Sequence, residues 1–277
     1  MSGYRMLSYL ERNSPIHALT GATKLIIFLL WSILVMVSFN TPILIALAVV
    51  GIVLFGISKI RFSEISFIIK ITGLFLALNL AAVYLFAPEH GVSIYQTRNV
   101  IAEGAGRFTL TQEQLFYEFN IFLKYITIIP PAILLIVTIH PSEFASSLNR
   151  IGIPYTVSYA VSLTLRYIPD VQRDYEAISQ AQQARGLELS RKASIVKRLK
   201  RTAPLLLPLI ISSIDRIDVI SRAMELRGFG KNKKRTWYSA KPFGTADILA
   251  IIISVLLFIA GMWITFQKGN RFYNPFI

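Results

Sequence analysis

Two arginines stand in the same local pattern, Ala-x-x-x-Arg-Gly, and are the side chains best placed to make a specific polar contact. An arginine in the last turn of a helix offers a planar cation with several N–H donors to a carboxylate or carbonyl of a partner. The following glycine permits the left-handed turn that ends a helix and leaves its tip exposed. The motif residues are Ala181, Ala184, Arg185 and Gly186 in the first copy and Ala223, Leu226, Arg227 and Gly228 in the second.

One such arginine is an ordinary way to end a helix, since a cation suits the negative end of the helix dipole. Two copies at the ends of successive helices favour a paired role in binding two similar partner surfaces. Sequence signals for catalysis are missing: the chain has no Gly-x-x-x-x-Gly-Lys-Ser/Thr motif for ATP hydrolysis and no cysteine. Its three histidines show no spacing for metal binding. We therefore expect a protein that is not an enzyme, has no metal site and binds no cofactor directly.

Two polar or amphipathic helices must position the arginines. The first is predicted to begin at Pro169-Asp170 and to end at Arg185, and the second to begin between Pro204 and Pro208 and to end at Arg227. The second helix carries an apolar stripe at helical spacing, which we expect to be buried against another helix or a membrane partner. The stripe consists of Ile210, Ile214, Ile217 and Met224.

The composition is that of a membrane protein. Hydrophobic residues make up 54% of the chain and charged residues only 16%, against roughly 25% charged in soluble domains. Since a span needs about 20 mostly apolar residues, we predict an all-α integral membrane protein with about five transmembrane helices and long cytoplasmic helices. The apolar runs are 25–39, 43–57, 65–86, 119–139 and 248–266. They divide the chain into a four-span membrane domain (1–139), a cytoplasmic helical domain (140–245) and a last span with its tail (246–277), while 88–114 is expected to be a loop.

The distribution of Lys and Arg predicts the orientation in the cell membrane. Residues 140–245 contain 18 Lys and Arg against eight Asp and Glu, which favours a cytoplasmic location for this segment and for the N-terminus, with the C-terminus outside. Basic clusters at 191–201 and 231–235 could bind nucleic acid. Beside membrane spans, anionic lipid is the simpler partner, so we expect contact with the bilayer and none with nucleic acid.

Beyond these features the sequence resembles the transmembrane (T) component of energy-coupling-factor (ECF) importers of vitamins and metal ions, the EcfT/CbiQ-like family. The resemblance covers nearly the whole chain and includes both Ala-x-x-x-Arg-Gly motifs, the second followed by Phe229-Gly230. It also includes Ser-Pro-Ile-His-Ala-Leu at 14–19, Lys-Leu at 24–25, Leu-Asn-Arg-Ile-Gly-Ile-Pro at 148–154 and Arg-Tyr-Ile-Pro at 166–169. Two positions depart from the family pattern: Gly21-Ala22 replaces Pro-Arg, and Leu226 replaces the alanine before Arg227.

The resemblance implies a non-catalytic coupling subunit that connects two cytoplasmic ATPases to a small substrate-binding membrane subunit, the S component. ATP would act through the ATPases, and the S component would choose the substrate. A self-sufficient permease is the alternative, with Lys70, Asn79, Glu118 and Lys124 as candidates for its path; it should show an internal repeat or broken spans in matching halves. A membrane enzyme acting on a lipid headgroup should show clustered acidic or histidine residues near an interface. We see neither signal.

Overall fold

The computed structural model describes residues 12, 14–103, 108–186, 195–232, 236–238, 240–267 and 271–276, with the backbone alone at 195–202. Nearly all of this part of the chain is helical, so the predicted all-α class is confirmed. The chain forms two compact units, one comprising 1–140 with 241–277 and the other comprising 141–240. We call them the membrane unit and the hairpin unit.

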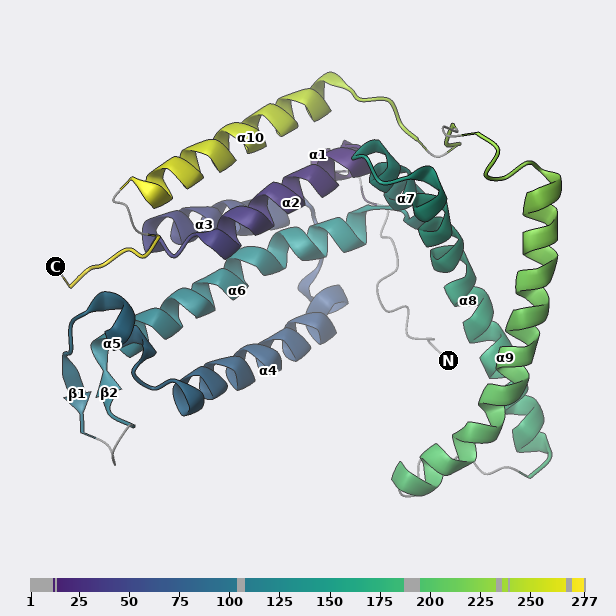
Figure 1. Ribbon diagram of the computed structural model, residues 1–277, viewed down its shortest axis with the longest axis horizontal. Helices are drawn as coiled ribbons and strands as arrows, with labels where there is room; N and C mark the ends of the chain where they lie inside the picture. The colour runs from purple at the N-terminus through teal and green to yellow at the C-terminus, as the bar shows by residue number, and fades with distance from the viewer. Residues whose placement is uncertain are drawn as a thin grey trace. The chain divides into compact units, whose positions relative to one another are not determined.

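Each of the five apolar runs forms a helix of the membrane unit (Figure 1). These helices are α2 (Gly21–Val37), α3 (Thr41–Ile57), α4 (Phe62–Phe86), α6 (Gln112–Thr138) and α10 (Thr245–Phe266). By length and composition α4, α6 and α10 can cross a bilayer. Helices α2 and α3 are apolar and have 17 residues each, the lower end of the range of about 17–25 residues for a span.

The segment predicted to be a loop is more ordered than expected. It contains α5 (His90–Tyr95) and a short antiparallel pair, β1 (Val100–Ala102) with β2 (Leu110–Thr111). Helix α6 therefore begins at Gln112, well before the predicted Phe119. Thr111 caps the helix at this early start, because its hydroxyl accepts a hydrogen bond from the N–H of Gln114 at 3.3 Å. The buried carboxylate of Glu113 also accepts hydrogen bonds from the backbone N–H and the side-chain amide of Asn99 at 2.9–3.1 Å.

Helix α6 is the centre of the membrane unit and packs against α2, α3 and α4. Its buried polar side chains each have a hydrogen-bond partner. Thr41 of α3 donates to Asn120 at 2.8 Å, and the indole of Trp31 in α2 donates to the carbonyl of Thr127 at 3.1 Å. Pro130 and Pro131 lie inside α6. The apolar core around these bonds comprises Trp31, Leu34, Val35, Leu44, Leu47 and Leu123.

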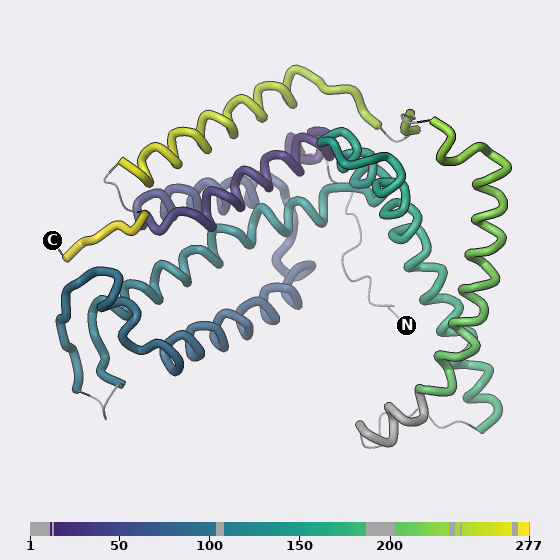
Figure 2. Tube along the Cα trace, viewed as in Figure 1, coloured from purple at the N-terminus to yellow at the C-terminus, as the bar shows by residue number. Residues whose placement is uncertain are grey.

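The first and last long helices of the membrane unit, α2 and α10, lie side by side and run parallel (Figure 2). At one end Asp247 accepts a hydrogen bond from the backbone N–H of Thr20 at 2.8 Å, and near the other end Thr265 donates to Ser38 at 2.9 Å. Both pairs are 227 residues apart in sequence. Between them Gly261 lies against Leu34, so closely that an added Cβ would be 2.7 Å from a Leu34 methyl carbon. Three contacts therefore fix α10 on α2.

The hairpin unit contains α7 (Pro141–Arg150), α8 (Tyr155–Ala184) and α9 (Ile195–Leu226). Helix α7 begins at Pro141, a residue that suits a first helical position, and Gly152, with φ of 107°, turns the chain after it. The predicted starts of the two longer helices were wrong. Pro169 lies inside α8, and Pro204 and Pro208 lie inside α9, so both helices begin earlier than the prolines suggested.

Candidate functional site

The first Ala-x-x-x-Arg-Gly motif ends α8 as the pattern predicts. The backbone N–H of Arg185 donates to the carbonyls of Ala181 and Gln182 at 3.3 and 3.1 Å. Gly186 follows with φ of 91°, a conformation that a residue with a side chain rarely adopts. Ala181, Ala184 and Arg185 are exposed, so this helix tip presents its guanidinium at the surface of the hairpin unit.

The second motif ends α9 with a complete left-handed cap. The N–H of Gly228 donates to Glu225 at 2.9 Å and that of Phe229 to Met224 at 2.9 Å, which is the Schellman arrangement. Gly228 has φ of 66°. Ala223 and Arg227 are exposed, and Leu226, which departs from the family pattern, is 89% exposed. A leucine at this position therefore fits the helix end without any change in packing.

The two tips lie at opposite ends of an antiparallel helix pair (Figure 2). Phe229, just beyond the second motif, packs on Tyr155 and Tyr159 at the start of α8, with ring centroids 5.6 and 4.8 Å apart. Arg185 is at the other end of α8, nearly 30 residues along the helix. At about 1.5 Å per residue the two arginines are about 40 Å apart. The pair therefore offers two separate binding surfaces.

An interhelical ion pair that the sequence did not reveal joins α8 to α9. Arg216 donates to Asp174 at 2.6 Å and lies 4.0 Å from Asp170, and all three side chains are about one-third exposed. Neither aspartate was predicted to be a site residue. The i,i+4 spacing of the two aspartates was the available signal, but the sequence does not say which arginine of α9 faces them.

We expect the Asp174–Arg216 pair to stabilise the hairpin by about 1 kcal/mol, between the values for exposed and for buried ion pairs. Thermal unfolding of Asp174→Ala, Arg216→Ala and the double variant measures this coupling energy. Arg173→Ala is the control, because Arg173 is 75% exposed in its own pair with Asp170 and should matter little. Additive effects of the two single changes would mean that the pair contributes nothing.

The residues of the predicted apolar stripe of α9 differ in solvent exposure. Ile210, Ile214 and Ile217 are 53%, 53% and 58% exposed, whereas Met224 is half-buried beside α8. The residues of α9 that face α8 include Arg216 and Ile220, on a neighbouring side of the helix. The prediction that the three isoleucines are buried against another helix of this chain is therefore wrong. They form an exposed apolar face of α9 together with Leu206, Leu207 and Ile211.

A hollow of about 580 Å³ lies beside the second motif. Arg166 and Arg227 line it together with aromatic side chains, among them Tyr155 and Trp237. The indole N–H of Trp237 donates to Asn149 at 3.0 Å, which holds the chain after α9 against the end of α7. The second tip therefore carries two guanidinium groups within an aromatic wall.

The polar residues considered for a transport path are dispersed. Lys70 and Asn79 are exposed on α4, while Glu118 accepts a hydrogen bond from Gln114 at 3.0 Å. Lys124 donates to the carbonyl of Met36 at 2.9 Å. Among the described residues no group of three or more His, Cys, Asp or Glu is close enough to hold a metal ion. Most of the two basic clusters, 191–201 and 231–235, lies outside the residues whose side chains are described.

Comparison with known proteins gives a consistent result. The model of the family described as "Cobalt transport protein" (CbiQ) matches residues 12–238. The energy-coupling factor transporter transmembrane protein EcfT of Streptococcus thermophilus is 29% identical over 257 residues, which cover 90% of this chain and 94% of the relative. EcfT of Streptococcus equi is 28% identical over 258 residues, covering 90% and 92%. EcfT of Acidaminococcus fermentans is 25% identical over 259 residues, covering 91% and 92%.

Proposed function

Because the chain belongs to the CbiQ family and is a transmembrane component of an energy-coupling-factor transporter, we propose that it is the non-catalytic subunit that couples two cytoplasmic ATPases to a substrate-binding S component. ATP is bound and hydrolysed by the ATPases, and the S component selects the vitamin or metal ion. The proposal places the hairpin unit and the N-terminus in the cytoplasm and the C-terminus outside the cell membrane.

One observation carries the proposal: α8 and α9 present two exposed Arg-Gly tips at opposite ends of one antiparallel pair. Each tip is small enough to enter a groove, since alanine lies one turn before the arginine. The separation of about 40 Å, derived from the helix rise, lets two ATPases bind without competing for the same surface. With only one ATPase bound, the arginine at the other tip would have no binding partner in the complex.

The exposed isoleucine face of α9 supports a third contact. Ile210, Ile214 and Ile217 are more than half exposed, together with their apolar neighbours on the same helix. Exposed apolar faces of this kind mark protein or membrane interaction sites. We assign this face to the S component, so that movement of α9 by the ATPases reaches the substrate-binding subunit directly.

Copurification tests the assembly. The tagged chain, expressed with its untagged partners and extracted in mild detergent, should retain two ATPase-sized subunits and one small hydrophobic protein. ATP-dependent uptake should require all of them in reconstituted vesicles. A chain that transports a substrate alone in vesicles would instead be a self-sufficient permease.

Cysteine labelling tests the orientation, and the chain contains no cysteine that would give background labelling. A cysteine at Gln180, exposed on α8, should resist an impermeant thiol reagent in intact cells and react after lysis. A cysteine at Glu103, exposed after β1, should react in intact cells. The opposite pattern would reverse the topology inferred from the basic residues.

A further inference from the structure

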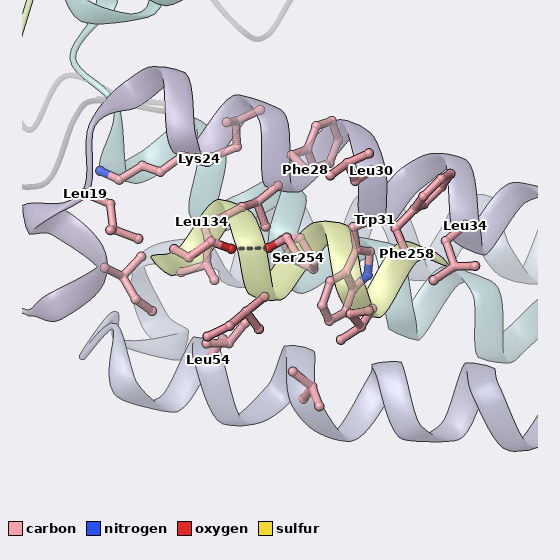
Figure 3. Close-up of a pocket in the computed structure, with 18 of the residues that line it drawn as sticks. Leu19, Lys24, Phe28, Leu30, Trp31, Leu34, Leu54, Leu134, Ser254 and Phe258 are labelled. Carbon is pink, nitrogen blue, oxygen red and sulfur yellow. Dashed lines mark hydrogen bonds between the residues drawn. The ribbon is translucent and has the colours of Figure 1, made fainter. Parts of the chain in front are cut away.

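The membrane unit encloses an apolar cavity of about 310 Å³ between α2, α3, α6 and α10 (Figure 3). This volume is within the range of about 300–1,000 Å³ that is usual for protein ligand cavities. Lys24 lies at one end of the cavity, and Leu34 and Phe258 lie at the other. We propose that the cavity binds one acyl chain of a membrane phospholipid.

The cavity is built into the fold by the contacts that fix α10 on α2. Asp247 holds the backbone of Thr20 at one end, and Gly261 meets Leu34 at the other. Every α2 and α10 residue that lines the cavity lies within this interval. The two helices are joined on both sides of the space, so they cannot close it by sliding or splaying without breaking a contact.

The wall of the cavity offers no free polar group to a polar ligand. The Ser254 hydroxyl donates to the carbonyl of Ala250 at 2.8 Å, and that of Thr138 donates to Leu134 at 2.7 Å. The indole N–H of Trp31 donates to the carbonyl of Thr127. Each of these polar groups is satisfied within the chain, and the rest of the wall apart from Lys24 is apolar. Water would gain few hydrogen bonds there, whereas a hydrocarbon chain would lose none.

The cavity also has an opening toward lipid. Val50 of α3 and Ile253 of α10 both line it, yet they are 39% and 54% exposed. On helices that cross a bilayer, exposed apolar side chains face hydrocarbon, so an acyl chain can enter between α3 and α10. The ammonium of Lys24 donates to the carbonyls of His17 and Thr138 at 3.4 and 3.0 Å. These two bonds hold the buried Lys24 side chain at that end of the cavity, so the acyl chain lies against the apolar wall.

Tryptophan quenching by brominated lipid tests the proposal in the full chain. The chain has three tryptophans, and Trp237→Phe with Trp263→Phe leaves only Trp31, which lines the cavity and is 6% exposed. In vesicles of phosphatidylethanolamine and phosphatidylglycerol with dibrominated chains, we expect Trp31 fluorescence to be quenched. Ala250→Phe fills the cavity and should remove at least half of this quenching.

Ala260→Phe is the matched control, the same substitution on the exposed side of α10, and should leave the quenching unchanged. Ser254→Leu is a second filling variant with a smaller added volume, and circular dichroism checks that each variant remains helical. Equal quenching in the filled and control variants would overturn the proposal.

Native mass spectrometry supplies an independent count. The full chain should retain one phospholipid after delipidation in detergent, as should Ala260→Phe, while both filling variants should lose it. The same measurement on the chain purified with its partners should also show the lipid. The proposal would be overturned if the complex with the partners retained no lipid and the filling variants bound the partners normally. A partner side chain would then occupy the cavity.

Discussion

Replacing both Arg185 and Arg227 with alanine should abolish coupled transport while the membrane unit remains folded. Each guanidinium is expected to form charge-assisted hydrogen bonds in an ATPase groove, and breaking a buried pair on one side costs about 3–5 kcal/mol. That loss corresponds to a decrease in docking affinity of at least about 100-fold per site. Uptake in reconstituted vesicles and copurification of the ATPases measure the two effects separately.

Each single Arg→Ala change should weaken one ATPase contact strongly, and Arg→Lys should rescue poorly, because an ammonium cannot reproduce the planar guanidinium. Arg173→Ala is the control, a loss of the same charge on the same helix from a side chain that is 75% exposed. If the double variant transports normally with both ATPases bound, the arginines are ordinary helix ends.

Ile214→Asp should separate the chain from its S component without unfolding the hairpin. Ile214 is 53% exposed in this chain, so the aspartate remains hydrated in the isolated protein. In the assembled transporter the same carboxylate would be buried without a partner, at a cost of several kcal/mol. Copurification of the S component and substrate uptake should both fall, whereas ATPase binding should persist.

Ser212→Asp is the matched control for this change. Ser212 is exposed on α9, two residues before Ile214 and therefore on a different side of the helix. Normal assembly is expected for Ser212→Asp. Equal loss of the S component in both variants would mean that added negative charge on α9 is harmful anywhere, and the isoleucine face would have no special role.

Local sequence signals predicted the apolar helices and both Arg-Gly helix ends. Apolar runs located the five apolar helices of the membrane unit, because burial in lipid depends on composition along one segment. Arg185-Gly186 and Arg227-Gly228 located the helix ends, because a left-handed cap is set by the residues at the cap itself. These predictions did not depend on which helices pack against each other.

The features that were predicted wrongly or missed have one physical cause: they depend on contacts between segments that are distant in the sequence. Pro169, Pro204 and Pro208 suggested helix starts, since proline suits a first turn, yet each lies inside a longer helix. Similarly, the apolar pattern of α9 did not reveal which side faces α8, because Arg216 and its aspartate partners contribute to that side. The Thr20–Asp247 bond joins residues too far apart in sequence for any local pattern to predict it.

The pairing of α2 with α10 has a consequence for biosynthesis. Each of its hydrogen-bonded contacts joins residues 227 positions apart, and the entire hairpin unit is translated between them. At about 5–20 residues per second, α2 waits roughly 10–45 s for its neighbour. During this interval its Leu34 face must be shielded by lipid or by an insertion factor. A truncated chain released before Thr245 would lack α10 and leave that face of α2 without its helical neighbour.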